Sequence, residues 1–181
     1  CFVYPHNLGE GKLYGAQEND FNYYKACALR GVGKKAEAES LFLEASVGNS
    51  QPAAAVYYND QKPDKIFYQG LALRELGREE EARSRFNNLI SYGEKHLYDV
   101  FKMDYFAVSL PDLQIWEDDM NKKNRIHCNY LMALGHLGLG NEEKAMRYFN
   151  AAAEMDNNHQ GVQIHRSQIN NPLVKRRGSK T

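Results

Sequence analysis

The side chains best suited to metal chemistry in this chain are His127, Cys128 and His136, which fall close together in one segment. Imidazole and thiolate groups are the usual ligands of zinc. On a helix, however, Cys128 and His136 lie two turns apart, about 12 Å along the axis, which is far for one metal ion. The His-x3-His and Cys-x2-Cys spacings that a zinc site needs do not occur here. The spacing therefore favours core or groove-lining roles for these side chains.

The acidic run 117–119 is the second candidate, either as a catalytic carboxylate pair or as a set of calcium ligands. Consecutive helical residues point in different directions, and no glycine-centred calcium loop follows the run. A solvated acidic face paired with Lys122, Lys123 and Arg125 is the favoured interpretation. The sequence contains no Gly-x-Ser-x-Gly, phosphate-loop or His-Glu-x-x-His motif. We therefore expect no catalysis, no metal and no cofactor in this chain.

Composition restricts the remaining functions. At 181 residues, the chain fits one domain with a sizeable core. Lys and Arg number 23, as do Asp and Glu, so a formal net charge of zero argues against nucleic-acid or anionic-membrane binding. No apolar run approaches the roughly 20 residues of a membrane span. Three sparse cysteines, Cys1, Cys27 and Cys128, indicate reduced thiols in a cytoplasmic protein.

Three segments share one spacing of glycine, alanine and phenylalanine, which predicts the helices that carry the side chains considered above. In each, a glycine is followed five residues later by alanine and four residues after that by phenylalanine. Glycine ends a helix with a left-handed backbone, alanine lets two antiparallel helices cross closely, and phenylalanine fills the space between neighbouring hairpins. A small residue also stands seven positions before each glycine, at Ala26, Gly70 and Ala133. The repeated residues are Gly33, Ala38 and Phe42; Gly77, Ala82 and Phe86; and Gly140, Ala145 and Phe149.

This pattern resembles the tetratricopeptide (TPR) repeat, a helix-turn-helix unit of about 34 residues. It predicts an all-α superhelix of three hairpins, at about 20–45, 63–92 and 121–155, within one domain spanning 20–170. Inserts at 46–62 and 96–120 separate the hairpins, with a short helix expected near Ala53–Tyr58 and a helix start at Ser109–Asp112. Asn158 is the predicted N-cap of a last, capping helix within 158–170. Residues 1–19 are predicted to form an extended lead-in and 171–181 a disordered basic tail, and a start at Cys1 suggests a fragment of a longer protein.

In a stack of such hairpins the first helices line the concave side. The inward positions of the repeat predict a groove that is aromatic and apolar with two arginines, a composition typical of interface hot spots. The alternative is that the insert helices fold back and fill this groove. The predicted groove residues are Tyr23, Cys27 and Arg30; Phe67, Leu71 and Arg74; and Tyr130, Leu134 and Leu137.

The runs YPHNLGEGKLYGAQEND, YYNDQKPDKIFYQGLALRELG and YGEKHLYDVFKMDYFAVSLPDLQIWEDDMNKKNRIHCNYLMALGHLGLG resemble the C-terminal part of a bacterial TPR family, over the chain to about His165. Longer members of that family carry an N-terminal domain of unknown function, a β-sandwich similar to sugar mutarotases. The resemblance implies that this chain is the helical half of a larger protein, and it identifies no catalytic residue in this half. Asn22, Asn129 and His136 depart from the general TPR pattern.

Two functions remain open. The first is a non-catalytic module that binds a protein or peptide through an open groove. The second is an accessory domain of a carbohydrate-active enzyme that packs on its own N-terminal domain. RNA binding would need a basic concave face and is disfavoured by the zero net charge. The sequence does not identify the partner or the oligomeric state.

Overall fold

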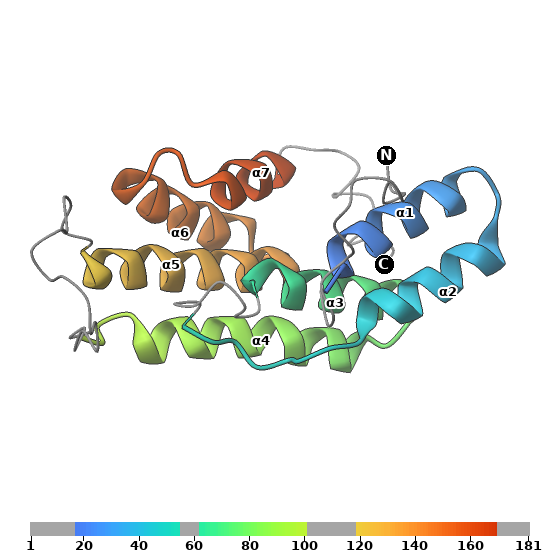
Figure 1. Cartoon of the computed structure of the whole chain (residues 1–181), viewed down its shortest axis with the longest axis horizontal. Coiled ribbons are helices and arrows are strands. Elements are labelled where there is room, and N and C mark those ends of the chain that lie inside the picture. Colours follow the sequence, from blue (N-terminus) through green and yellow to red (C-terminus); the bar gives the residue numbers. More distant parts are fainter. Residues whose placement is uncertain (1–16, 55–61, 101–118, 170–181) are drawn as a thin grey trace, which may run out of the picture.

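The computed structural model describes residues 17–54, 62–100 and 119–169, and in these ranges all regular secondary structure is α-helical (Figure 1). The all-α prediction is therefore confirmed. The helices are α1 (Asn19–Gly31), α2 (Lys35–Ser46), α3 (Pro63–Glu75), α4 (Glu79–His96), α5 (Met120–Gly138), α6 (Glu142–Met155) and α7 (Gln160–Ile169). Across these residues, no helix is long and apolar enough to cross a membrane.

The first six helices pack in consecutive pairs, α1 with α2, α3 with α4, and α5 with α6 (Figure 1). Each pair lies on one of the three predicted hairpins, except that α4 continues to His96 and α5 begins at Met120. The pairs also pack on one another, because α2 contacts α3 and α4 contacts α5. The result is one continuous stack in which α5 lies between α4 and α6.

The same turn joins the two helices of every pair. Gly33, Gly77 and Gly140 have φ angles of 86°, 76° and 79°, the left-handed backbone that the spacing rule predicts. The residue after each glycine donates its backbone N–H to the carbonyl five positions earlier, at 2.9 Å in all three turns. This is the Schellman arrangement, which satisfies carbonyls at the end of the first helix and reverses the chain.

The alanine and phenylalanine of each repeat are buried, as predicted. Ala82, Phe86 and Phe149 are completely inaccessible, and Ala38, Phe42 and Ala145 are at most 3% exposed. The Phe86 ring shows why small residues are needed opposite it. A Cβ added to Gly70 would lie 2.4 Å from this ring, and one added to Gly138 would lie 2.2 Å from it. Two helices, α3 and α5, thus approach a single aromatic ring through glycine.

Several local predictions need correction or fall outside the described residues. Helix α7 begins at Gln160, and its N-cap is His159 rather than Asn158, because the His159 Nδ1 accepts the Val162 N–H at 3.1 Å. Ala53 and Ala54 are not helical. The remainder of the helix predicted near 53–58, the start predicted at 109–112, most of the lead-in and the basic tail lie outside the described ranges.

Candidate functional site

The predicted groove positions divide into two groups in the structure. On α1, Tyr23, Cys27 and Arg30 are half-buried, as are Leu71 and Arg74 on α3. The other members of the set are core residues that a partner cannot reach while the fold is intact. They are Phe67, Tyr130, Leu134 and Leu137, all at most 8% exposed.

Both groove arginines are bound within the protein. Arg30 pairs with Glu75 of the next hairpin and lies over the Phe42 ring at 4.9 Å. Arg74 donates from Nη2 to the Gly138 carbonyl at 2.6 Å and from Nε to the Glu79 carboxylate at 3.2 Å. Because each guanidinium binds a group of the next hairpin, these arginines stabilise the contact between hairpins. Their donors are already used within the protein and do not mark a ligand site.

Helix α7 covers the inner face where α3 and α5 meet. Its Val162, His165 and Ile169 side chains, at 0%, 2% and 5% exposure, join the main core cluster. The His165 ring meets the Phe67 ring edge-on, with centroids 5.5 Å apart. The sequence left open whether inserts fill the groove. In the described residues, the element that covers Phe67 on this inner face is α7.

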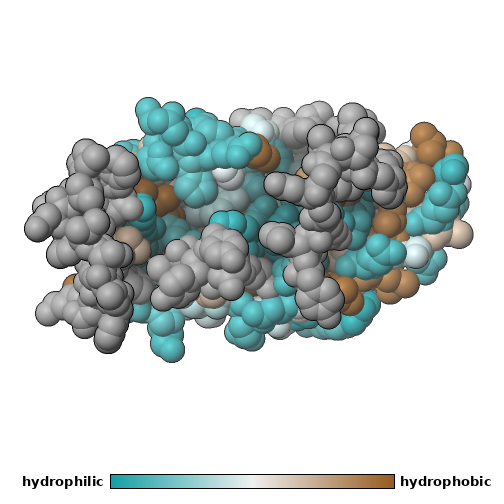
Figure 2. Space-filling view, in the orientation of Figure 1, coloured by the Kyte–Doolittle hydropathy of each residue, from teal (hydrophilic) through white to brown (hydrophobic). Residues whose placement is uncertain are grey.

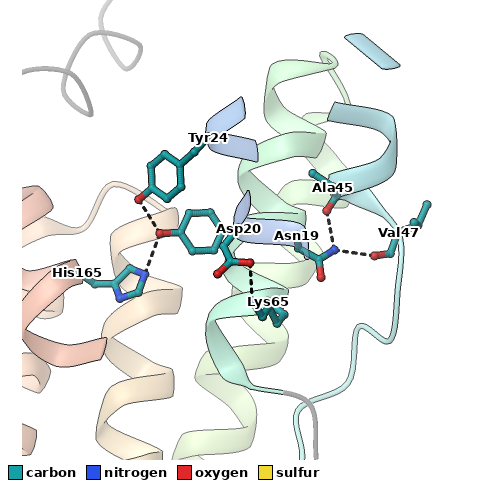
Figure 3. Close-up of polar contacts among 8 residues, drawn as sticks. Asn19, Asp20, Tyr24, Ala45, Val47, Lys65 and His165 are labelled. Carbon is teal, nitrogen blue, oxygen red and sulfur yellow. Dashed lines mark hydrogen bonds and ion pairs between the residues drawn. The ribbon is translucent and has the colours of Figure 1, made fainter. Parts of the chain in front are cut away.

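A chain of hydrogen bonds around His165 joins α7 to α3 and α1 (Figure 3), and the Tyr130 hydroxyl of α5 lies 3.0 Å from the His165 Nδ1. The His165 Nδ1 lies 2.7 Å from the Gly161 carbonyl, which can only accept, so Nδ1 carries the proton. Nε2 therefore accepts from the Tyr68 hydroxyl at 3.2 Å, and Tyr68 accepts from the Tyr24 hydroxyl at 2.7 Å. Gln168 Nε2 donates to Tyr24 at 2.8 Å. Every bond in this chain points the same way.

Burial determines the charge state of this tyrosine–histidine cluster, which consists of Tyr24, Tyr68, Tyr130, His165 and Gln168. Loss of solvation raises the pKa of the Tyr68 and Tyr130 hydroxyls and lowers the pKa of the His165 imidazole. All three groups are therefore neutral near pH 7. A neutral cluster whose polar atoms bond one another satisfies the polar groups buried at the seam of α7.

The start of α1 is anchored by two further contacts (Figure 3). The Asn19 amide donates to the carbonyls of Ala45 and Val47, each at 2.8 Å, and so ties α1 to the end of α2. The Asp20 carboxylate pairs with the Lys65 ammonium at 2.5 Å and ties α1 to α3. These contacts explain why the first hairpin keeps its place on the stack.

The connection after α2 is held as an extended strap, residues 47–54, which sequence reasoning missed. Three side chains from three helices each donate to one of its backbone carbonyls. Gln69 of α3 binds the Asn49 carbonyl at 3.1 Å, Asn88 of α4 binds that of Ser50 at 3.0 Å, and His127 of α5 contacts that of Ala53 at 2.8 Å. The sequence signal that could have indicated this role is Gln69, a polar residue among the apolar residues of α3, and the structure buries it completely.

The residues first considered for metal chemistry are dispersed. The Cys128 thiol is buried and donates to the Asn124 side-chain oxygen at 3.5 Å, and burial raises its pKa to about 12. His136 stacks on Tyr148 with ring centroids 5.5 Å apart. Asp119 caps α5 by accepting the Lys122 N–H at 2.8 Å. Within the described ranges, no three His, Cys, Asp or Glu side chains are grouped to hold a metal ion.

Exposed apolar side chains are concentrated on the first hairpin. Phe21 and Val32 are 52% and 75% exposed, and Leu43 and Val47 of its second half are 49% and 64% exposed. Figure 2 shows apolar surface over the right-hand end of the molecule, where α1 and α2 lie in Figure 1. Burying such side chains against a partner is favourable, since each removes apolar area from water.

The chain matches no protein-family model and shows no significant match to a solved structure.

Proposed function

We propose that this chain is a non-catalytic protein-interaction module built as a TPR-like stack of three hairpins. The observation that carries the proposal is the threefold recurrence of one turn and one buried alanine–phenylalanine pair on successive hairpins. A repeated hairpin that contacts only its neighbours presents long helical faces, and such proteins act through surface rather than through a catalytic cleft. The buried His165, neutral near pH 7 and hydrogen-bonded to Tyr68, supports the same conclusion.

The first hairpin is the face that we assign to the partner. Its exposed apolar residues Val32, Leu43 and Val47 stand apart from the arginines and aromatics that the stack uses internally. The predicted cytoplasmic location and bacterial source remain part of this proposal. The partner is a protein with an apolar surface, which would remove these exposed side chains from water.

The same exposed hairpin favours one alternative. In a longer polypeptide, an upstream domain would pack on α1 and α2, and this chain would then be its accessory helical domain. The resemblance to a family with an N-terminal β-sandwich leads to this alternative. In that case the apolar side chains of the first hairpin are an internal interface, and no separate partner binds them.

Site-specific photo-crosslinking distinguishes these functions. A photoreactive phenylalanine replaces Val32 or Leu43 in cells of the source organism, with Tyr98, which is 83% exposed on the chain after α4, as the matched control position. The proposal expects a defined protein crosslinked from positions 32 and 43 and not from 98. With purified components, Val32→Glu should lower the affinity of this chain for the crosslinked protein at least tenfold.

Three other results would be informative. A product equally strong from position 98 would contradict the proposal, because it would show nonspecific capture. An identified partner whose affinity is unchanged by Val32→Glu would contradict the assignment of the face. Crosslinks confined to an upstream region of the same polypeptide would establish the accessory-domain alternative.

A further inference from the structure

Helix α7 meets the rest of the protein through a short and regular set of side chains. The helix spans Gln160–Ile169, ten residues, and buries Val162, His165 and Ile169. These residues stand at positions i, i+3 and i+7, which form one stripe of a helix. The opposite side of α7 is exposed, including Ile164 at 45%. Helix α7 thus has the amphipathic form of a helical ligand.

The surface beneath α7 is shaped to receive a helix. The Phe67 ring provides an apolar wall at 5.5 Å from the His165 ring, and the Tyr68 and Tyr130 hydroxyls lie 3.2 Å and 3.0 Å from its two nitrogens. The close approach depends on glycine in α7. A Cβ added to Gly161 would lie only 2.4 Å from the Tyr130 hydroxyl.

The attachment of α7 is also separable from the hairpin stack. Each of the six preceding helices packs extensively against the other member of its hairpin, whereas α7 packs less extensively, on α6 and α5. An isolated helix of this length is marginal in water, so α7 depends on the inner face for its order. Elements with few buried contacts open locally before the rest of a protein unfolds.

We infer that the inner face formed by Phe67, Tyr68 and Tyr130 is a binding site for an amphipathic helix, and that α7 is its resident occupant. The fitting partner helix carries an apolar residue, a histidine three positions later and an apolar residue four positions after that. It binds by displacing α7, in the helix-in-groove mode. This inference rests on the proposed interaction function and adds a second, regulated site to it.

A peptide titration into the full chain tests the inference. The probe is a fluorescein-labelled synthetic peptide of residues 156–169, whose anisotropy reports binding. Ile169→Asp releases α7 by placing a charge in the core, and Gly161→Ala releases it by the clash with Tyr130. Both variants should bind the peptide at least tenfold more tightly than the unmodified chain. Ile164→Asp alters an exposed position of the same helix and should bind like the unmodified chain.

Two controls make the result specific. A peptide with alanine at the position of His165 should lose most of its affinity, because the tyrosine hydroxyls then face no imidazole. Hydrogen exchange should show rapid exchange of α7 amides in Ile169→Asp and Gly161→Ala, with the amides of α3 and α5 still protected.

The inference is overturned if α7 is released in a folded variant and the peptide still fails to bind. It is also overturned if α7 amides stay protected in both variants, or if both variants unfold, since α7 would then be an integral part of the fold. These outcomes are independent of the proposed function. The probe is synthetic, whereas the function is tested by crosslinking a natural partner at Val32 and Leu43.

Discussion

The Arg74 guanidinium donates a 2.6 Å hydrogen bond to the backbone carbonyl of Gly138, and so joins the second hairpin to the third. Arg74 stands three residues before the turn glycine of its hairpin, and Gly138 stands two residues before that of the next. Arg30 and Glu75 hold the same two positions one hairpin earlier and form an ion pair. Both junctions between hairpins therefore use the same pair of positions. The arginine binds a side-chain carboxylate at the first junction and a backbone carbonyl at the second.

Replacing Arg74 should loosen the last junction. Arg74→Met keeps most of the apolar stem and removes the donors, so a charge-assisted bond is lost. We expect the free energy of unfolding to fall by about 1.5–3 kcal/mol in urea denaturation. Arg83→Met is the matched control, since Arg83 is 57% exposed and pairs with Glu79 only at the surface. It should change stability by less than about 0.5 kcal/mol, and equal effects of the two would contradict the junction role.

Phe86 should tolerate no larger neighbour at Gly138. The added Cβ of Gly138→Ala falls 2.2 Å from the buried ring, so the core must shift, at a cost of about 1–3 kcal/mol or more. Phe86→Leu in the same chain should recover part of this loss by making room. Gly31→Ala is the control, because its Cβ meets nothing within 4 Å and alanine favours helix. Thermal melting compares the variants, and an unchanged melting temperature for Gly138→Ala would show that the packing is looser than described.

The two described cysteines should differ sharply in reactivity. Burial raises the pKa of Cys128 to about 12, so very little thiolate exists at pH 8, whereas Cys27 is half-buried and in no disulfide. In the native protein, a maleimide should label Cys27 and spare Cys128, and urea should make both reactive. Peptide mass spectrometry separates these sites from Cys1. Rapid native labelling of Cys128 would contradict its complete burial on α5.

Acid should destabilise the fold through its histidines. Burial lowers the pKa of His136, His159 and His165 in the folded state, so above the unfolded value of about 6.5 all three are neutral in both states. As the pH falls below that value, the unfolded chain takes up protons first. Each such histidine then removes up to about 1.4 kcal/mol per pH unit until its folded pKa is reached.

Urea midpoints at pH 7.5 and pH 5.5 measure this loss. His165→Gln cannot titrate, so its stability should fall less between the two pH values than that of the unmodified chain. Between pH 7.5 and 8.5 the histidines should contribute no change. A steeper acid loss in His165→Gln would contradict the neutral buried state of His165.

The local parts of the fold were predictable because they depend on short-range physics. The positive φ at Gly33, Gly77 and Gly140 was predictable because glycine adopts the left-handed conformation at little energetic cost. A new helix begins within two residues of each glycine. Burial of Ala82 and Phe86 follows from their spacing on one helix face. The candidate groove was only half predictable. The position of a residue within the repeat predicts whether it faces inward, but not which other element packs against it.

The sequence by itself thus determined an all-helical chain and the position of its hairpins and turns, because these depend on residues within about ten positions of each other. Only the tertiary structure decided that α7 would cover Phe67 and Tyr130, and that Arg30 and Arg74 would hold the junctions. His165 meets Tyr68 across 97 positions of sequence, and Gln168 meets Tyr24 across 144. No local periodicity encodes contacts of that range, because they depend on how whole helices pack and which faces remain to be covered.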